Sequence, residues 1–131
     1  MSIASQQITP FLTFFGQAEE AMQFYVSLFG EESAIVHVVR HEDGKVLQGA
    51  FRLRGQTYMC SDSMLKHEWT FTPGVSFFVS CKSEEEIARL FEGLSEGGKV
   101  HMPLGDYGFS QKFGWTDDRF GVSWQLNLDR A

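Results

Sequence analysis

The stretch ITPFLTFFGQAEEAMQFYVSLFG, residues 8–30, decides the fold because it joins a strand pattern to a helix pattern through one glycine. Residues 8–15 are almost all apolar or β-branched, which predicts a strand. After Gly16, apolar residues recur at helical spacing to about residue 28, and acidic residues occupy the first turn, where they favour a helix. Gly30 predicts the end of this helix.

Three further strands are predicted after the helix, over residues 33–41, 45–54 and 56–62. Turn signals EDGK and RGQ separate them. Short polar turns of this kind connect antiparallel neighbours, so the three strands predict a meander. The first module is therefore βαβββ.

The same order returns in GVSFFVSCKSEEEIARLFEGLSEGG, residues 74–98. Ser83 is a good helix N-cap, with Glu86 in the capping-box position three residues later. Strands are then predicted near residues 99–102, over 107–115 and from Val122. The sequence thus predicts a second βαβββ module and an α+β fold. In this fold each helix covers one face of a mixed sheet, and the free faces of the two cupped sheets enclose a cavity.

The length and charge of the chain limit its class. A chain of 131 residues is long enough for one domain, which we expect to span residues 1–131 with module one at about 7–62 and module two at about 73–129. The net charge of −6 argues against nucleic-acid binding, which needs clustered cations. The sequence shows no export signal and no apolar run long enough for a membrane span, so we expect a cytoplasmic protein without a membrane partner.

Cys60 and Cys81 are the two cysteines. Neither lies in a CxxC motif or beside a histidine, so metal binding and nucleophilic use are not indicated. We expect two free, buried thiols. The alternative is one disulfide, which would be favoured in an exported protein.

The helix motif AEEAMQFYVSLFG, the second helix SEEEIARLFEGLSEGG and the ending WTDDRFGVSWQ resemble one known group of proteins. This is the vicinal oxygen chelate superfamily of glyoxalases, bleomycin-resistance proteins and extradiol dioxygenases. Within it, the chain is most similar to the PhnB-like branch, also called the 3-demethylubiquinone-9 3-methyltransferase domain. The resemblance covers about residues 7–128, and it implies a homodimer.

Enzymes of this superfamily commonly hold a divalent metal through four His, Glu or Gln side chains on four strands. Carried over by the order of elements, these positions fall on Pro10, Met59, Val75 and Gln125. Only Gln125 is a potential ligand, and a stable site needs three or four nitrogen or oxygen ligands. We therefore expect no metal and no other cofactor.

These four positions also mark the predicted cavity face. Side chains alternate between the two faces of a strand, so neighbours two residues away should share this face. The neighbours are Leu12, Phe14, Thr57, Phe77, Val79, Ser123 and Asn127. The strand over residues 107–115 could add Lys112 or Ser110, and Trp124, Leu126 and Leu128 should face a helix.

Other polar residues have ordinary structural explanations. His37, His41, His67 and His101 are interpreted as strand, turn, loop and strand-end residues. Asp117 and Asp118 precede Gly121 and are interpreted as turn residues, with an acid role for Asp118 as the alternative. Gln125 either satisfies backbone groups of a neighbouring strand or contacts a ligand.

A largely apolar face with a few polar groups is typical of a small-molecule site. The sequence therefore predicts a metal-free cavity that binds a small, apolar or aromatic molecule, with no catalytic residue assigned. The alternative is a metal-dependent lyase or dioxygenase. A methyltransferase is not supported, because no glycine-rich turn after a parallel strand is present for S-adenosylmethionine.

Overall fold

The structure is a computed structural model, and it describes residues 6–130. The chain divides between Glu68 and Trp69 into two compact units, which correspond to the two predicted modules. The expectation about an export signal bears partly on residues 1–5, which lie outside the described residues. In the part of the chain that is described, no helix is long and apolar enough to cross a membrane.

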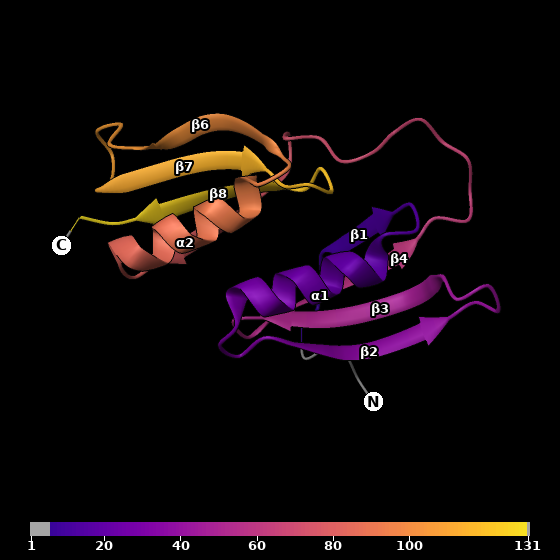
Figure 1. Cartoon of the computed structure of the whole chain (residues 1–131). Coiled ribbons are helices and arrows are strands. Elements are labelled where there is room, and N and C mark those ends of the chain that lie inside the picture. The colour runs from indigo at the N-terminus through magenta and orange to yellow at the C-terminus, as the bar shows by residue number, and fades with distance from the viewer. Residues whose placement is uncertain (1–5, 131) are drawn as a thin grey trace. The chain divides into compact units, whose positions relative to one another are not determined.

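Both units have the predicted order of one strand, one helix and three strands (Figure 1). The first comprises β1 (Phe11–Phe14), α1 (Ala18–Phe29), β2 (Ala34–Arg40), β3 (Val46–Leu53) and β4 (Gln56–Asp62). The second comprises β5 (Ser76–Cys81), α2 (Glu84–Ser95), β6 (Lys99–Gly105), β7 (Lys112–Asp117) and β8 (Ser123–Leu128).

Each unit forms one four-stranded mixed sheet, with strand orders β1-β4-β3-β2 and β5-β8-β7-β6. The first strand of each unit runs parallel to the last, and the other pairs are antiparallel. Figure 1 shows α1 across one face of the first sheet and α2 across one face of the second. The α+β class and the repeated module are therefore confirmed.

Helix α1 begins at Ala18 because a residue distant in sequence caps it. Gln17 makes no side-chain cap, but Oδ1 of Asp62 accepts a hydrogen bond of 2.9 Å from the backbone N–H of Ala18. The second oxygen of Asp62 accepts from the N–H of Val46 at 2.9 Å. One buried carboxylate thus ties the helix start to strands β3 and β4, and it satisfies an N–H that the helix leaves free.

Helix α2 has the local cap that the sequence predicts. Oγ of Ser83 accepts a hydrogen bond of 3.1 Å from the N–H of Glu86. The Glu86 carboxylate reaches back and accepts from the N–H of Lys82 at 2.7 Å, one residue before the usual capping-box position. The buried face of α2 consists only of apolar residues, namely Ile87, Leu90, Phe91 and Leu94.

Both cysteines are free and buried, as predicted. Burial raises the pKa of the Cys60 thiol to about 12, and the nearby Asp62 carboxylate adds to this effect. The thiol is therefore protonated at neutral pH, and a protonated thiol is a poor nucleophile.

One predicted strand is wrong over half of its length. The strand expected over residues 107–115 begins only at Lys112. Gly108 has a φ of +101°, outside the strand region, and its N–H donates to Oδ1 of Asp106 at 2.8 Å. The segment is a turn whose aromatic side chains Tyr107 and Phe109 pack edge-on against Phe113, with ring centroids 6.2 and 5.0 Å away.

Candidate functional site

The candidate site is the open face of the second sheet, which is the face that α2 does not cover. Gly114 identifies the covered face, because a Cβ atom at this position would lie 2.5 Å from Cε1 of Phe91 in α2. Leu126 pairs with Gly114 and shares its face. Side chains alternate along a strand, so Trp115 and Gln125 lie on the open face.

This register confirms which side chains of β8 were predicted to lie on each face of the sheet. Ser123, Gln125 and Asn127 lie on the open face, whereas Trp124, Leu126 and Leu128 face α2 and are buried. The strand was predictable because its polar and apolar residues alternate without interruption.

The predicted face is wrong for three other residues of this unit, one of which is Val79, since it pairs with Leu126 on the helix-covered face. Phe77 pairs with Trp124, and their ring centroids lie 5.3 Å apart on the helix-covered face. Lys112 pairs with Leu128, and its Nζ lies 3.2 Å from Oε1 of Glu84 in α2. Lys112 therefore forms an ion pair at the helix start and does not reach the open face.

In the first unit, the expected face is wrong for Leu12 and Phe14. Leu12 pairs with Cys60, which pairs with Gly49. A Cβ atom on Gly49 would lie 2.9 Å from Cε of Met22 in α1. Leu12 and Phe14 are thus buried beneath α1.

Three other predicted contacts, Met59, Pro10 and Val75, remain predictions. Met59 pairs with Phe11 and lies on the open face of the first sheet. Pro10 precedes β1, and its carbonyl oxygen accepts from the N–H of Met59 at 2.9 Å. Val75 precedes β5 and is 73% exposed.

The centre of the open face of the second sheet is a row of an aromatic, an amide and an aromatic side chain. Phe78 pairs with Gln125, and Gln125 pairs with Trp115. Phe78 is 59% exposed, and the other two side chains are half-buried. We name Phe78, Gln125 and Trp115 the central row.

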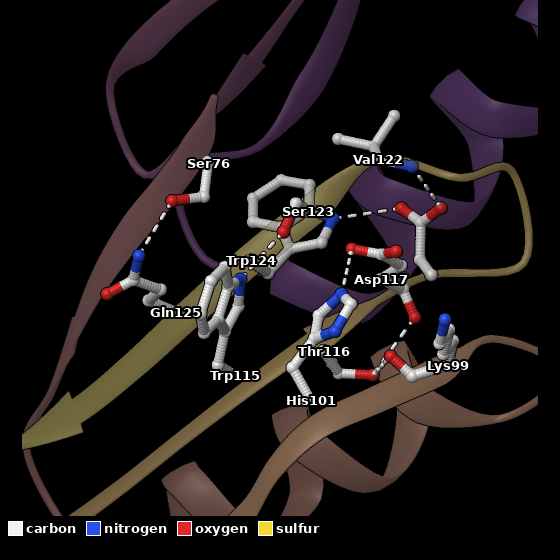
Figure 2. Close-up of polar contacts among 11 residues, drawn as sticks. Ser76, Lys99, His101, Trp115, Thr116, Asp117, Val122, Ser123, Trp124 and Gln125 are labelled. Carbon is white, nitrogen blue, oxygen red and sulfur yellow. Dashed lines mark hydrogen bonds and ion pairs between the residues drawn. The ribbon is translucent and has the colours of Figure 1, made fainter. Parts of the chain in front are cut away.

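The Gln125 amide is fixed on one side and free on the other. Its Nε2 donates a hydrogen bond of 2.9 Å to Oγ of Ser76 (Figure 2). Within residues 6–130, its carbonyl oxygen has no hydrogen-bond partner. Trp115 is fixed in the same way, since its Nε1 donates to Oγ of Ser123 at 2.8 Å. Gln125 and Trp115 are therefore each held by one hydrogen bond, and the central row offers one unused acceptor.

Asp118 fixes the turn that joins β7 to β8. Its Oδ1 accepts hydrogen bonds from the N–H groups of Phe120 and Val122, at 2.8 and 3.1 Å. Its Oδ2 accepts from Nε1 of Trp124 at 2.8 Å. The side chain is 3% exposed. This carboxylate is a structural anchor for the turn, as the turn interpretation predicts.

A polar pair next to the central row was not predicted from the sequence. Nε2 of His101 on β6 lies 2.9 Å from Oδ1 of Asp117, which is the last residue of β7 and not a turn residue. The His101 ring also packs on Trp115, with centroids 4.9 Å apart. No sequence signal indicated this pair, because the ladder between β6 and β7 is irregular on both sides of Met102.

The donors present do not fit the divalent metal that the superfamily resemblance implies. The open-face residues of the four strands concerned are Phe11, Thr13, Thr57, Met59, Ser61, Ser76, Phe78, Ser80, Ser123, Gln125 and Asn127. They include no imidazole, carboxylate or thiolate, the groups that usually bind such metals. In the described part of the chain, no three His, Cys, Asp or Glu side chains are grouped so that they could hold an ion.

Comparison with known proteins agrees with this architecture. The family model described as 3-demethylubiquinone-9 3-methyltransferase matches residues 6–127. The PhnB protein from Bacillus cereus is 50% identical, with a TM-score of 0.91 over 94% of this chain and 99% of that chain. Protein YjdN from Escherichia coli strain K12 is 23% identical over 92% of this chain and 94% of its own length.

A more distant structure shows the wider fold. A glyoxylase/bleomycin resistance protein/dioxygenase domain from Frankia sp. EAN1pec has a TM-score of 0.70 at 14% identity, over 97% of this chain and 93% of that chain. The two βαβββ units therefore have the fold expected of the vicinal oxygen chelate superfamily. The chain belongs to the PhnB-like family described as 3-demethylubiquinone-9 3-methyltransferase.

Proposed function

We propose that the open face of the second sheet binds a small, flat, largely apolar or aromatic molecule without a metal ion. The observation that carries this proposal is the central row, in which Gln125 lies between Phe78 and Trp115 and keeps its carbonyl oxygen unused. Binding sites for small molecules combine apolar walls with a few fixed polar groups.

The chemistry of the row suggests the kind of ligand. Exposed aromatic rings gain most by stacking on another flat ring, which adds about 0.5–1.5 kcal/mol to the burial of area. The Gln125 oxygen can only accept, and its Nε2 is committed to Ser76. A planar ring that carries an N–H or O–H donor therefore matches the row best.

The metal-dependent lyase or dioxygenase is the weaker candidate because the donor set of the open faces does not fit a divalent ion. Methyl transfer from S-adenosylmethionine is weaker still. That chemistry is typical of a parallel sheet with a glycine-rich turn. Within residues 6–130, each sheet has only one parallel strand pair. The connection from β1 to α1 consists of Phe15, Gly16 and Gln17, so it contains a single glycine.

Replacing Gln125 by Ala should weaken binding of a donor-bearing aromatic ligand by about 3–10-fold, the worth of one neutral hydrogen bond. Ligands are first found by a thermal-shift screen of flat aromatic compounds, and affinities are then measured by calorimetric titration. Gln125→Leu keeps the side-chain volume and should lose as much affinity as Gln125→Ala.

The matched control is Gln23→Ala, which removes the same side chain from an exposed position on α1. Its affinity should equal that of the unaltered protein. If Gln125→Ala and Gln125→Leu also bind every hit with unchanged affinity, the site is not on the central row.

A further inference from the structure

His101 and Asp117 form an isolated polar pair on the open face of the second sheet. Nε2 of His101 and Oδ1 of Asp117 lie 2.9 Å apart, and their side chains are 20% and 17% exposed. Both atoms are shielded from solvent, and within residues 6–130 neither meets the geometry of a hydrogen bond, with the other or with any further group. Such groups are costly to bury unless they serve each other, and at 2.9 Å the two atoms are within ion-pair distance of each other.

The second ring nitrogen of His101 is in the opposite situation. No described residue hydrogen-bonds to Nδ1, and this atom is not among the buried, unpartnered polar atoms of the described chain. It is therefore at least partly exposed to solvent. In a neutral imidazole with the proton on Nε2, Nδ1 carries the lone pair and can accept a proton.

The His101–Asp117 pair lies next to the central row, where we propose that the ligand binds. The His101 ring packs against Trp115, which belongs to the central row (Figure 2). A flat molecule that stacks on Trp115 would thus place its edge near the imidazole.

We propose that His101, positioned by Asp117, accepts the proton of an acidic hydroxyl on an aromatic ligand of the phenol class bound at the central row. This proposal rests on the proposed function and deepens it. The ligand O–H bond breaks, its electron pair stays on oxygen, and a new N–H bond forms at Nδ1. The products are a phenolate and an imidazolium, which the Asp117 carboxylate stabilises, so that charge and atoms balance.

Few other charges face this pair within its unit. Lys99 on β6 pairs with Asp117 and is the neighbouring cation. The opposite face of the sheet is covered by α2, whose buried residues are all apolar. The charged residues of α2 are exposed or make their contacts at the start of the helix. The ionisation of a bound phenol should therefore depend mainly on His101 and Asp117.

The test uses the full chain with 4-nitrophenol, whose ionised form alone absorbs visible light, and with its methyl ether 4-nitroanisole, which cannot ionise. At a pH just below that at which free 4-nitrophenol ionises, the ratio of phenolate to phenol should rise by about tenfold or more on binding. An opposite charge within about 4–6 Å has an effect of this size. The protein should also bind 4-nitroanisole.

The variants His101→Gln and Asp117→Asn separate the two roles. His101→Gln should keep affinity for 4-nitroanisole and lose the enrichment of phenolate. Asp117→Asn should reduce that enrichment and shift its pH profile, because the imidazolium loses its stabilising carboxylate. His37→Gln is the matched control, since His37 is a half-buried histidine on a strand of the first sheet, and it should behave as the unaltered protein.

Binding of 4-nitroanisole without enrichment of phenolate would overturn the proton transfer and leave the proposed function standing. Enrichment of phenolate that persists in the His101→Gln variant would likewise overturn the proton transfer and leave the proposed function standing. Failure of the unaltered protein to bind either probe would overturn both.

Discussion

Replacing Asp118 by Ala is expected to lower the free energy of unfolding by about 3–5 kcal/mol. The substitution removes the acceptor for three donors, namely the N–H groups of Phe120 and Val122 and Nε1 of Trp124. The site is buried, with Asp118 3% and Trp124 1% exposed. Each buried donor without a partner costs about 1–3 kcal/mol, and small domains have only about 5–15 kcal/mol in total.

Urea unfolding followed by circular dichroism measures this loss. The matched control is Asp43→Ala, because Asp43 lies in an exposed turn and its carboxylate accepts only one described hydrogen bond, from the N–H of Lys45 at 2.9 Å. The control should lose less than about 1 kcal/mol. Equal losses for the two variants would show that Asp118 does not anchor the turn.

Replacing Gly98 by Ala is expected to cost at least about 3 kcal/mol, the upper end of the range for overpacking. A Cβ atom here would overlap the carbonyl oxygen of Asp117 and lie 2.9 Å from the carbonyl carbons of Asp117 and Asp118. These are backbone atoms, so no side chain can rotate away to make room. The turn held by Asp118 and the pair formed by Asp117 would both be displaced.

Gly74→Ala is the control for Gly98→Ala. Gly74 also lacks a positive φ, and its added Cβ atom would meet only Oγ1 of Thr72 at 3.4 Å. This variant should change stability by less than about 1 kcal/mol. If chemical denaturation shows Gly98→Ala to be as stable as Gly74→Ala, the close approach of Gly98 to the backbone of Asp117 and Asp118 is incorrect.

The order of elements could be predicted because it depends on local signals. Gly30 ends α1 with a φ of +67°, and Ser83 caps α2 through its own hydroxyl. The face of β8 was also predictable, since Ser123 to Leu128 alternate strictly between polar and apolar residues. Only one arrangement of such a strand buries its apolar side chains.

The faces of β1 and β5 could not be predicted in the same way. Each strand has a pair of adjacent phenylalanines, Phe14 with Phe15 at the end of β1 and Phe77 with Phe78 within β5, so the aromatic residues fall on both faces and weaken the period-two signal. The deciding contact is tertiary, because the less exposed member of each pair is the one on the helix-covered face. An error of one residue in such a strand moves every side chain to the other face, which accounts for Leu12, Phe14, Phe77 and Val79.

The partners of the polar residues were also outside what sequence can indicate. His101 and Asp117 are 16 positions apart in the printed sequence, and they meet because the β6–β7 ladder shifts register beside Met102. The alternating aromatics from Tyr107 to Phe113 likewise imitate a strand, whereas the Asp106–Gly108 turn interrupts it. Shifts and turns of this kind depend on neighbouring elements.

The most direct test of ligand binding at the central row uses the three tryptophans, which occupy different environments. Trp115 lies on the open face, Trp124 is buried beneath α2, and Trp69 is 59% exposed at the unit boundary. Their indole N–H signals are assigned in a ¹⁵N-labelled protein with Trp→Phe variants, and a flat aromatic ligand is then titrated. We expect saturable shifts of the Trp115 signal, with Trp69 and Trp124 unchanged. Saturable binding that leaves the Trp115 signal unchanged would show that the ligand does not bind at the central row.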